Sequence, residues 1–246
     1  MIKKFCAAMT FMTIIPLPSP TLSDRDFGRL SWYFPLVGVC LGIILGGAAL
    51  GMLQIFPQLV TAAVLTFLLP ALSGALHLDG LADTADGFLS CRNRERMLEI
   101  MRDSHIGAMG VFAMICLMLI KFAVFASMPY DRLPYYAVAV PIAGRCALVF
   151  YLGISKYVRQ SGLAMMFYQY KTSGLTIYAI IILFASSYLL CGSLGIFSSI
   201  AVLIFVIIWD IICNNKIGGA TGDTLGACCE LAELIFLLGV ISFFHP

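Results

Sequence analysis

Residues 174–212 read GLTIYAIIILFASSYLLCGSLGIFSSIAVLIFVIIWDII and contain one charged side chain, Asp210. A transmembrane helix needs about 20 predominantly apolar residues. This stretch therefore predicts two membrane-spanning helices, at 174–192 and 195–212, joined by a tight turn. The rest of the chain has the same character, because 61% of its 246 residues are hydrophobic and 11% are charged. The sequence predicts an all-α, polytopic integral membrane protein.

The apolar runs divide the chain into about seven predicted spans. Transmembrane β-strands would need alternating polarity, which these runs lack. No linker separates the runs, so residues 1–246 are predicted to form one domain, which opens with a retained amphipathic or interfacial segment. The nine cysteines show no C-x-x-C pair, and neither a disulfide framework nor a zinc site is expected. The predicted spans are roughly 31–56, 58–76, 108–127, 134–153, 174–192, 195–212 and 232–244.

The basic residues fall on one side of these spans. They precede the first span and lie in every second loop after it, whereas only Arg132 lies in a loop on the opposite side. Cytoplasmic loops carry an excess of Lys and Arg, so the basic side is predicted to face the cytoplasm across a bacterial plasma (inner) membrane. Membrane lipid is the expected surrounding, and the net charge of +2 does not indicate nucleic acid as a partner. The basic residues on this side are Lys3, Lys4, Arg25, Arg29, Arg92, Arg94, Arg96, Arg102, Lys156, Arg159, Lys171 and Lys216.

Residues 77–87, HLDGLADTADG, place three carboxylates at the predicted cytoplasmic face. Asp79, Asp83 and Asp86 are spaced i, i+4 and i+7, so on a helix they share one face and repel one another. A hard cation such as Mg²⁺, which prefers carboxylate, water and phosphate oxygens, would turn that repulsion into binding. The alternative is a solvated helix whose aspartates simply face water. His77 is a candidate general base or a structural hydrogen-bonded group.

Residues 218–233, GGATGDTLGACCELAE, form a second acid-bearing stretch on the same predicted face. Asp223 and Glu230 add candidate metal ligands. A glycine-rich turn that enters a helix offers free backbone N–H groups to an anion. Glycines between helices are often only turns, so both interpretations stay open. The candidate phosphate contacts here are Gly219, Gly222 and Thr224.

Residues 101–110, MRDSHIGAMG, form the third polar stretch. Arg102, Ser104 and His105 are candidate phosphate contacts. Asp103 or Ser104 is equally a candidate cap for the helix that follows, and both functions are compatible.

Two cations lie within predicted spans. A cation at bilayer depth costs roughly 2.5–3.5 kcal/mol on insertion scales, so it usually faces a cavity or a partner. Arg145 lies near the middle of its span and is a candidate for binding substrate anion or for a structural ion pair. Asp210 is a candidate partner for it. Lys121 either has a similar role or extends its ammonium group to the outer interface.

The three stretches together resemble the cobalamin synthase family, the adenosylcobinamide-GDP ribazoletransferases. HLDGLADTADGF, RERMLEIMRDSHIGAMG and GGATGDTLGACCELAE occur in this order, and the similarity covers most of the chain. The resemblance implies a Mg²⁺-dependent transfer in which the 5′ oxygen of α-ribazole, or of its 5′-phosphate, attacks the phosphorus attached to cobinamide in adenosylcobinamide-GDP. GMP leaves, and adenosylcobalamin or its 5′-phosphate forms.

The resemblance also implies roles for individual residues. His77, or an aspartate not bound to metal such as Asp83 or Asp86, would act on the proton of the attacking hydroxyl. A corrinoid nucleotide and α-ribazole are the implied partners, and a homo-oligomer or association with other corrinoid-assembly enzymes stays open. The implied metal ligands are Asp79, Asp83, Asp86, Asp223 and Glu230, and the implied substrate or phosphate contacts are Arg102, Ser104, His105, Arg145, Gly219, Gly222 and Thr224.

Other classes of membrane protein also place aspartates at a membrane face. CDP-alcohol phosphotransferases expect a DGxxAR element where this chain has DGLADT, and aromatic prenyltransferases expect two N/D-D-x-x-D motifs, which this sequence lacks. A cation transporter would use the acids as ion ligands, but transporters usually bind near the bilayer midplane through broken helices. Acids that cluster at one face favour chemistry at the membrane surface.

Overall fold

The computed structural model describes residues 1–18 and 21–242, which are almost wholly helical. Within these residues the β structure is limited to an isolated bridge between Tyr157 and Ala220. The predicted all-α fold is therefore confirmed. The elements are α1 (Ile2–Met12), α2 (Asp24–Gly28), the 3₁₀ helix η1 (Arg29–Tyr33), α3 (Phe34–Leu53), α4 (Gln58–Leu72), α5 (Leu76–Leu89), α6 (Arg94–Ile100), α7 (Ala108–Ser127), α8 (Leu133–Ile154), α9 (Leu163–Gln169), α10 (Gly174–Ile217) and α11 (Gly222–Ile241).

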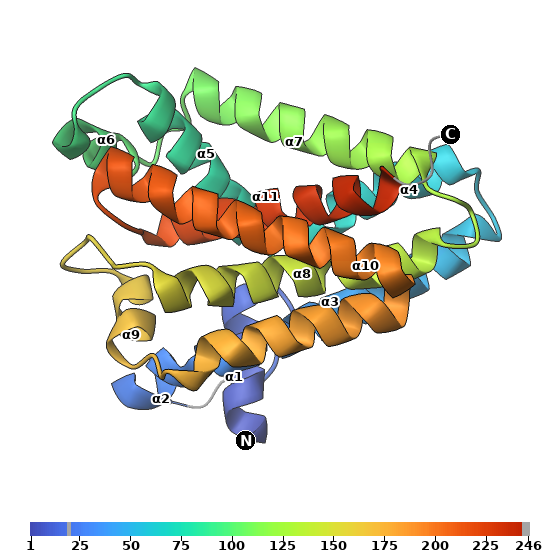
Figure 1. Ribbon diagram of the computed structural model, residues 1–246, viewed down its shortest axis with the longest axis horizontal. Helices are drawn as coiled ribbons and strands as arrows, with labels where there is room; N and C mark the ends of the chain where they lie inside the picture. The colour runs from blue at the N-terminus through green and yellow to red at the C-terminus, as the bar shows by residue number, and fades with distance from the viewer. Residues whose placement is uncertain (19–20, 243–246) are drawn as a thin grey trace.

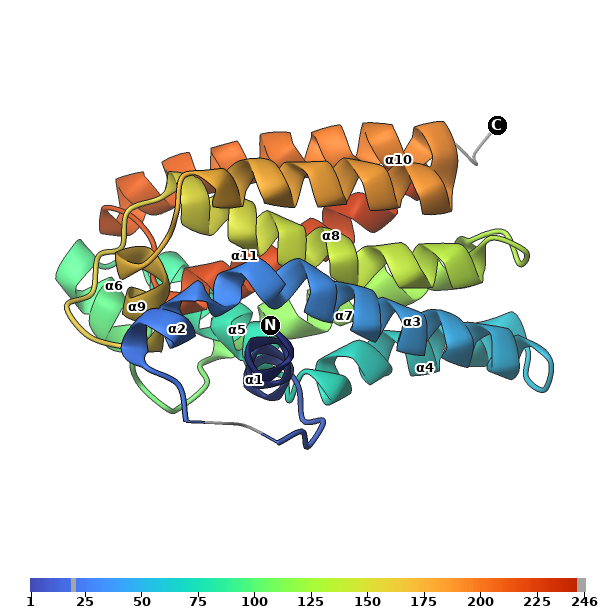
Figure 2. The same ribbon diagram turned by 90° about the horizontal axis from the view of Figure 1, so that it is seen from below.

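The long helices α3, α7, α8, α10 and α11 run along one common direction and form the body of the molecule (Figure 1). Helix α8 is central, because it packs against α3, α10 and α11 and is buried over most of its length. The short helix α1 runs across the long helices rather than along them (Figure 2). It packs against η1 and α3 and so closes one side of the bundle.

In the described part of the chain, five helical segments are long and apolar enough to cross a membrane, or six if α4 and α5 form one bent span. Helix α10 changes direction at Gly192, whose φ of 61° and ψ of −142° are not helical. Figure 1 shows its two limbs antiparallel and side by side. The predicted turn between the apolar runs of 174–212 is therefore confirmed, and the predicted count of about seven spans is approximate.

Three predicted span boundaries are wrong. The first spanning segment begins at Asp24 rather than at 31, because α2, η1 and α3 follow one another without a break. Helix α4 ends at Leu72 rather than at 76, since the chain bends by 89° between α4 and α5. The last span is not the short segment 232–244, because α11 begins at Gly222. Residues 243 and 244 of that prediction lie outside the described residues.

Helix α11 begins early because its first turn is capped. The Thr224 N–H donates to the Thr221 hydroxyl at 3.2 Å, and the Thr221 N–H donates to the Thr224 hydroxyl at 2.8 Å. This reciprocal capping box satisfies backbone donors that the start of a helix leaves unpaired. Asp223 and Glu230 therefore lie on a helix and not in a segment that precedes the last span, as the predicted boundaries implied.

Helices α3 and α8 approach closely because glycines at every fourth position of α3 face α8. A Cβ on Gly38 would lie 2.7 Å from the carbonyl oxygen of Pro141, and one on Gly42 would overlap the carbonyl of Val138. Gly46 continues the series one turn further along. Small residues at this spacing let transmembrane helices pack backbone against backbone.

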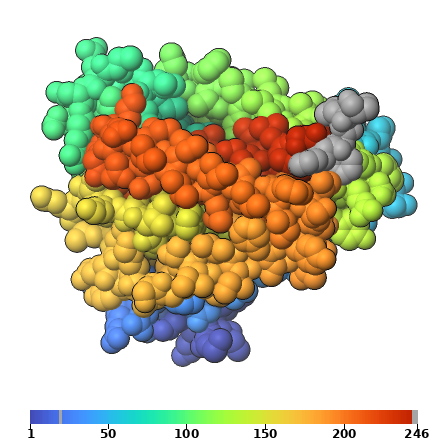
Figure 3. Space-filling view, in the orientation of Figure 1, coloured from blue at the N-terminus to red at the C-terminus, as the bar shows by residue number. Residues whose placement is uncertain are grey.

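The two limbs of α10 form the middle of the face shown in Figure 3. Soluble proteins rarely expose a contiguous apolar patch larger than a few hundred Å², and the outward side chains of α10 are almost all apolar. This face is therefore suited to contact lipid hydrocarbon. Its exposed side chains include Ile177, Ile181, Tyr188, Leu189, Ile204 and Ile211.

The segments that carry most of the basic residues lie at one end of the bundle. Helix α6, helix α9, the loop before α9 and the C-terminal end of α10 meet there, whereas the loop between α7 and α8, which carries Arg132, lies at the opposite end (Figure 1). The basic residues are thus segregated along the bundle axis, in agreement with their predicted distribution.

Candidate active site

A sharp bend turns the first acidic stretch back into the bundle. The chain turns through Gly74 and Ala75, whose φ angles are 58° and 56°, and α5 leaves at 89° to α4. Helix α5 then packs against α11 and α7. Asp79 and Asp83 lie on this helix, one turn apart, as their spacing predicts.

Glycines bring α5 and α11 close enough for their acids to lie together. A Cβ on Gly80 would lie only 2.7 Å from the carbonyl oxygen of Asp223, so no larger residue fits there without moving a backbone. Gly226 faces α5 in a similar way. The close approach places Asp79 and Asp83 beside the first turn of α11, which carries Asp223.

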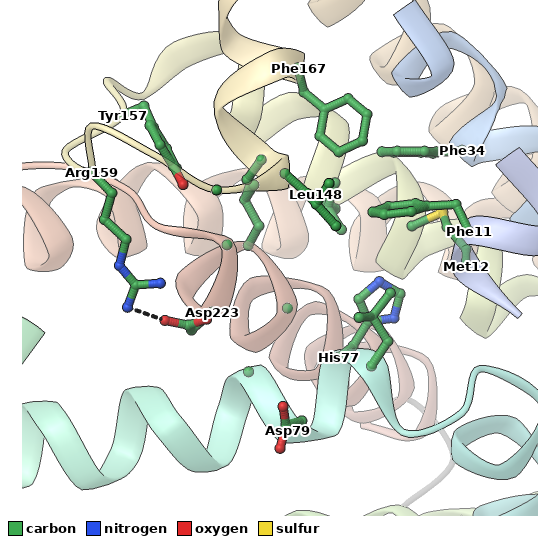
Figure 4. Close-up of a pocket in the computed structure, with 18 residues that line it drawn as sticks. Phe11, Met12, Phe34, His77, Asp79, Leu148, Tyr157, Arg159, Phe167 and Asp223 are labelled. Atoms are coloured by element: carbon green, nitrogen blue, oxygen red, sulfur yellow. Dashed lines mark hydrogen bonds and ion pairs between the residues drawn. The ribbon is translucent and has the colours of Figure 1, made fainter. Parts of the chain in front are cut away.

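The loop between α8 and α9 supplies a cation to these acids. A parallel bridge pairs Tyr157 with Ala220, and the Val158 N–H donates to the Ala220 carbonyl at 3.0 Å. The bridge holds the loop beside the start of α11. From there, Nη2 of Arg159 donates to Oδ2 of Asp223 at 2.6 Å (Figure 4). An ion pair thus joins two segments that are 64 residues apart in the chain.

The acids of this cluster outnumber its cation. Asp83 is half-buried, where water screens charges less than at the surface. Mg²⁺ commonly takes one or two protein carboxylates and completes its shell with water and substrate phosphates, so the acids fit such an ion. Within residues 1–18 and 21–242, no three His, Cys, Asp or Glu side chains form a cage that would hold a metal by themselves. The charges that act on Asp83 are those of Asp223, Asp79, Asp86 and Arg159.

A cavity of about 290 Å³ opens beside the acids. Asp79, Asp223 and Arg159 line its polar side, and side chains of α1, α3, α8 and α9 form an apolar wall opposite (Figure 4). Tyr157 also lines it, and burial raises the pKa of the Tyr157 hydroxyl, which therefore stays a neutral donor near pH 7. A ligand in this cavity meets carboxylates, a guanidinium group and apolar surface together.

Asp86 is not among the residues that line this cavity. Its carboxylate accepts hydrogen bonds from the backbone N–H groups of Gly107 (2.7 Å) and Gly110 (2.9 Å) at the start of α7. A carboxylate there satisfies unpaired donors and complements the positive end of the helix. The structure thus engages Asp86, predicted as a catalytic group and metal ligand, in capping α7.

A cluster of four charges lies inside the bundle. Lys121 Nζ of α7 donates to carboxylate oxygens of Glu230 and Glu233 of α11, both at 2.6 Å. Arg145 of α8 donates to the other oxygen of Glu233. All four side chains are at most 3% exposed, so each depends on its partners in place of water. Two cations balance two carboxylates.

The buried cluster decides between alternatives that the sequence left open for Lys121 and Arg145, and it changes the expected surroundings of Glu230. Glu230, predicted as a metal ligand, is paired with Lys121 instead of lying with the aspartates. Lys121 does not reach an interface. Arg145 pairs with Glu233 and not with Asp210, and it has a structural environment rather than a place on the cavity wall.

His77 connects the buried cluster to the cavity. Its Nδ1 lies 3.2 Å from Nη2 of Arg145. A guanidinium group can only donate, so Nδ1 accepts and the neutral ring carries its proton on Nε2. That Nε2 is buried and has no hydrogen-bond partner among the described residues, while the ring lines the cavity (Figure 4). In this arrangement His77 is a hydrogen-bond donor and not a general base.

The predicted phosphate contacts divide into two groups. Gly222 lines the cavity, whereas Thr224 is buried in the capping box and Gly219 packs against the Lys156 carbonyl. The stretch 102–105 is exposed and lies outside the cavity lining. The residues of this stretch that were predicted to contact phosphate are Arg102, Ser104 and His105.

A local hydrogen bond shapes the exposed stretch. His105 Nδ1 lies 2.7 Å from Asp103 Oδ1, and this hydrogen bond lowers the pKa of the Asp103 carboxyl. Asp103 therefore stays ionised at neutral pH and is engaged with His105.

Comparison with known proteins identifies the family. The model of the family described as cobalamin-5-phosphate synthase matches residues 4–241. The chain belongs to this family. A protein of Desulfitobacterium hafniense named adenosylcobinamide-GDP ribazoletransferase is 37% identical over 99% of this chain and 98% of its own length. Proteins of the same name from Klebsiella pneumoniae (39% identical, over 98% of this chain and all of the relative) and Acetivibrio thermocellus (36%, over 96% of each) are also similar. No solved structure matches this chain.

The resemblance to the cobalamin synthase family is therefore confirmed. In this family member, the structure adds residues that the sequence gave no reason to select for the site. Arg159 appeared only as one basic loop residue among several, since nothing in its neighbourhood indicates the bridge between Tyr157 and Ala220. Phe11 of α1 and Phe167 of α9 line the cavity from segments that lack any polar motif.

Replacing Gly80 by Ala in this cobalamin-5-phosphate synthase family member will separate α5 from α11. Overpacking of this kind typically costs about 1–3 kcal/mol, and we expect the free energy of unfolding in mixed detergent micelles to fall by that amount. Gly47→Ala on α3 is the control, because its Cβ would meet nothing within 4 Å. It should be neutral or stabilising by up to about 1 kcal/mol. If the two substitutions change the free energy of unfolding equally, the close approach of α5 to α11 at Gly80 is contradicted.

Removing one charge from the buried cluster will destabilise the fold more than removing an opposite pair. Lys121→Met leaves an uncompensated carboxylate, and breaking a buried pair in this way costs about 3–5 kcal/mol. Adding Glu230→Gln restores neutrality and should recover most of the loss, as measured by the same unfolding assay. If the double variant is less stable than Lys121→Met, the cluster is not held together by charge balance.

Proposed function

We propose that this chain catalyses the reaction for which its relatives are named. The 5′ oxygen of α-ribazole, or of α-ribazole 5′-phosphate, forms a bond to the phosphorus attached to cobinamide in adenosylcobinamide-GDP. The bond from that phosphorus to the oxygen bridging the two phosphates breaks, and GMP leaves with that oxygen. The observation that carries this assignment is the meeting of the acids of α5 and α11 with Arg159 at one cavity.

The acids are suited to hold Mg²⁺ against the diphosphate of this substrate. Asp83 and Asp223 are the ligands that we propose, because they approach one another from α5 and α11 and Arg159 offsets only part of their charge. Mg²⁺ bound there would neutralise charge on the phosphate oxygens as the leaving group departs. Asp86 and Glu230 are left out of this set, since α7 and Lys121 already engage their carboxylates.

Arg159 is the proposed phosphate contact. Its guanidinium is paired with Asp223, and it matches phosphate geometry better than an ammonium group does. A metal held by Asp223 would leave Arg159 free to donate to a phosphate oxygen. Gly222 lines the cavity at the N-terminus of α11, where the helix dipole also favours an anion.

The proton of the attacking hydroxyl must go to a carboxylate in this scheme. His77 Nε2 already carries a proton, so His77 orients an oxygen by donating to it. Asp79 is exposed and lines the cavity, which makes it the most accessible acceptor. Asp83, which is less exposed, is better placed to bind metal.

The end of the bundle that carries the basic residues is proposed to face the cytoplasm across a bacterial plasma membrane. The cluster of acids and the loop of Arg159 lie toward this end, and the excess of Lys and Arg there follows the positive-inside rule (Figure 1). Soluble nucleotide substrates would then reach the cavity from the cytoplasm.

Purified protein will release GMP from adenosylcobinamide-GDP when α-ribazole and Mg²⁺ are present. EDTA should stop the release, and excess Mg²⁺ should restore it, because Arg159 alone would not neutralise the charge that develops on the leaving phosphate. Chromatography of the corrinoid product against GMP checks that one cobalamin forms per GMP. If EDTA does not change the rate of GMP release, the reaction does not depend on a metal ion.

Asp83→Asn will reduce the rate of GMP release by at least about 100-fold, the scale expected for losing a group that stabilises charge in the transition state. The variant should insert and fold, since Asn is nearly isosteric with Asp. Asp131→Asn is the matched control, because Asp131 is an exposed carboxylate in the loop at the opposite end of the bundle. An Asp83→Asn rate close to that of the control would exclude Asp83 from the metal site.

A further inference from the structure

The cavity has two chemically distinct halves. Asp79, Arg159 and Asp223 form the polar half, and His77 lies at the boundary (Figure 4). The apolar half is built from four separate elements, and its side chains carry no strong hydrogen-bonding group. These side chains are Phe11, Met12, Phe34, Leu148, Leu163 and Phe167.

Three phenylalanines give the apolar half the character of an aromatic box. The Phe167 ring meets Phe11 edge to face, with centroids 5.5 Å apart, and meets Phe34 edge to face at 5.3 Å. Phe11 and Phe34 are nearly parallel, with centroids 6.1 Å apart. Rings in mixed orientations present both faces and edges to a flat aromatic ligand, which suits the arrangements that aromatic pairs prefer.

We infer that this cavity is the binding site of α-ribazole, with its base in the aromatic box and its ribose toward His77 and Asp79. The inference rests on the proposed function and identifies which of the two substrates the cavity holds. It orders the nucleoside across the cavity, from the apolar wall of α1, α3 and α9 to the acids of α5 and α11.

Size and polarity separate α-ribazole from the other substrate. The cavity volume of about 290 Å³ lies at the lower end of the range of about 300–1,000 Å³ typical of small-molecule sites, too small for a corrin ring with its side chains. Guanine is also flat and bicyclic, but its edge carries several donors and acceptors that would lose their partners in the apolar half. The base of α-ribazole is a methyl-substituted benzimidazole, whose edge has almost no hydrogen-bond donors or acceptors.

The ring of His77 borders the cavity and carries a buried, unpaired donor that the sugar of the same ligand would satisfy once the ring turns toward it. A buried N–H without a partner costs free energy until something accepts its hydrogen bond. The ribose offers hydroxyl oxygens, and a ribose at His77 would direct its 5′ oxygen toward Asp79 and the acids beyond. Arg145 acts here as a positioning residue, because its hydrogen bond to Nδ1 keeps the proton on Nε2.

Phe167→Leu tests the aromatic box in the full-length protein. We expect KM for α-ribazole to rise roughly tenfold, the scale of one lost aromatic contact, while KM for adenosylcobinamide-GDP stays unchanged. Phe27→Leu is the control, because Phe27 stacks on Phe167 at 5.5 Å but does not line the cavity. It should leave both values as in the wild type. If Phe167→Leu fails to fold, Ala164→Leu, which narrows the cavity from α9, replaces it.

Equilibrium dialysis with radiolabelled α-ribazole separates this inference from the proposed reaction. Wild type and Phe27→Leu should bind the nucleoside alike, and Phe167→Leu should bind it roughly tenfold more weakly, whether or not GMP is released. A rise in KM for adenosylcobinamide-GDP alone, or binding that does not depend on Phe167, would overturn the inference. Failure of the reaction would appear instead as wild-type protein that binds α-ribazole and releases no GMP.

Discussion

The structure depends on charges that are buried inside an apolar bundle and must find their partners there. Lys121, Arg145, Glu230 and Glu233 link α7, α8 and α11, and His77 extends the network to α5. Water does not reach any of these groups. A shift of one helix that separates a pair would therefore leave an unpaired charge in the interior of the bundle. The cluster therefore fixes the register of the helices that carry the site.

The same register places the acids that we propose for the site. Helices α5 and α11 cross where Gly80 and Gly226 remove the side chains that would keep them apart, and Asp79, Asp83 and Asp223 lie beside this crossing. The buried cluster lies deeper in the bundle and holds the same two helices. Stability and chemistry are thus separated along one pair of helices, with balanced charge in the interior and excess carboxylate beside the cavity.

The sequence predicted the fold class, the face shared by Asp79 and Asp83, and the two acid-bearing stretches, because periodicity and composition are local signals. It could not predict which acids meet. Asp223 and Glu230 are seven residues apart on one face of α11, yet a helix rises about 1.5 Å per residue, so Glu230 lies about 10 Å deeper, beside Lys121. Asp86 shares a face with Asp83, but its carboxylate accepts a hydrogen bond from the backbone at the N-terminus of α7. These outcomes depend on contacts between segments distant in the chain.

Metal binding is the most direct measurement of the central claim, that acids from α5 and α11 form one cation site at the cavity. Mn²⁺ can replace Mg²⁺ and be followed by electron paramagnetic resonance, with adenosylcobinamide-GDP present and α-ribazole withheld. Asp83→Asn and Asp223→Asn should each weaken Mn²⁺ binding. The double variant Lys121→Met, Glu230→Gln, which keeps the buried charges balanced, should leave the bound signal in place. Binding lost in the double variant and retained in both aspartate variants would contradict the claim.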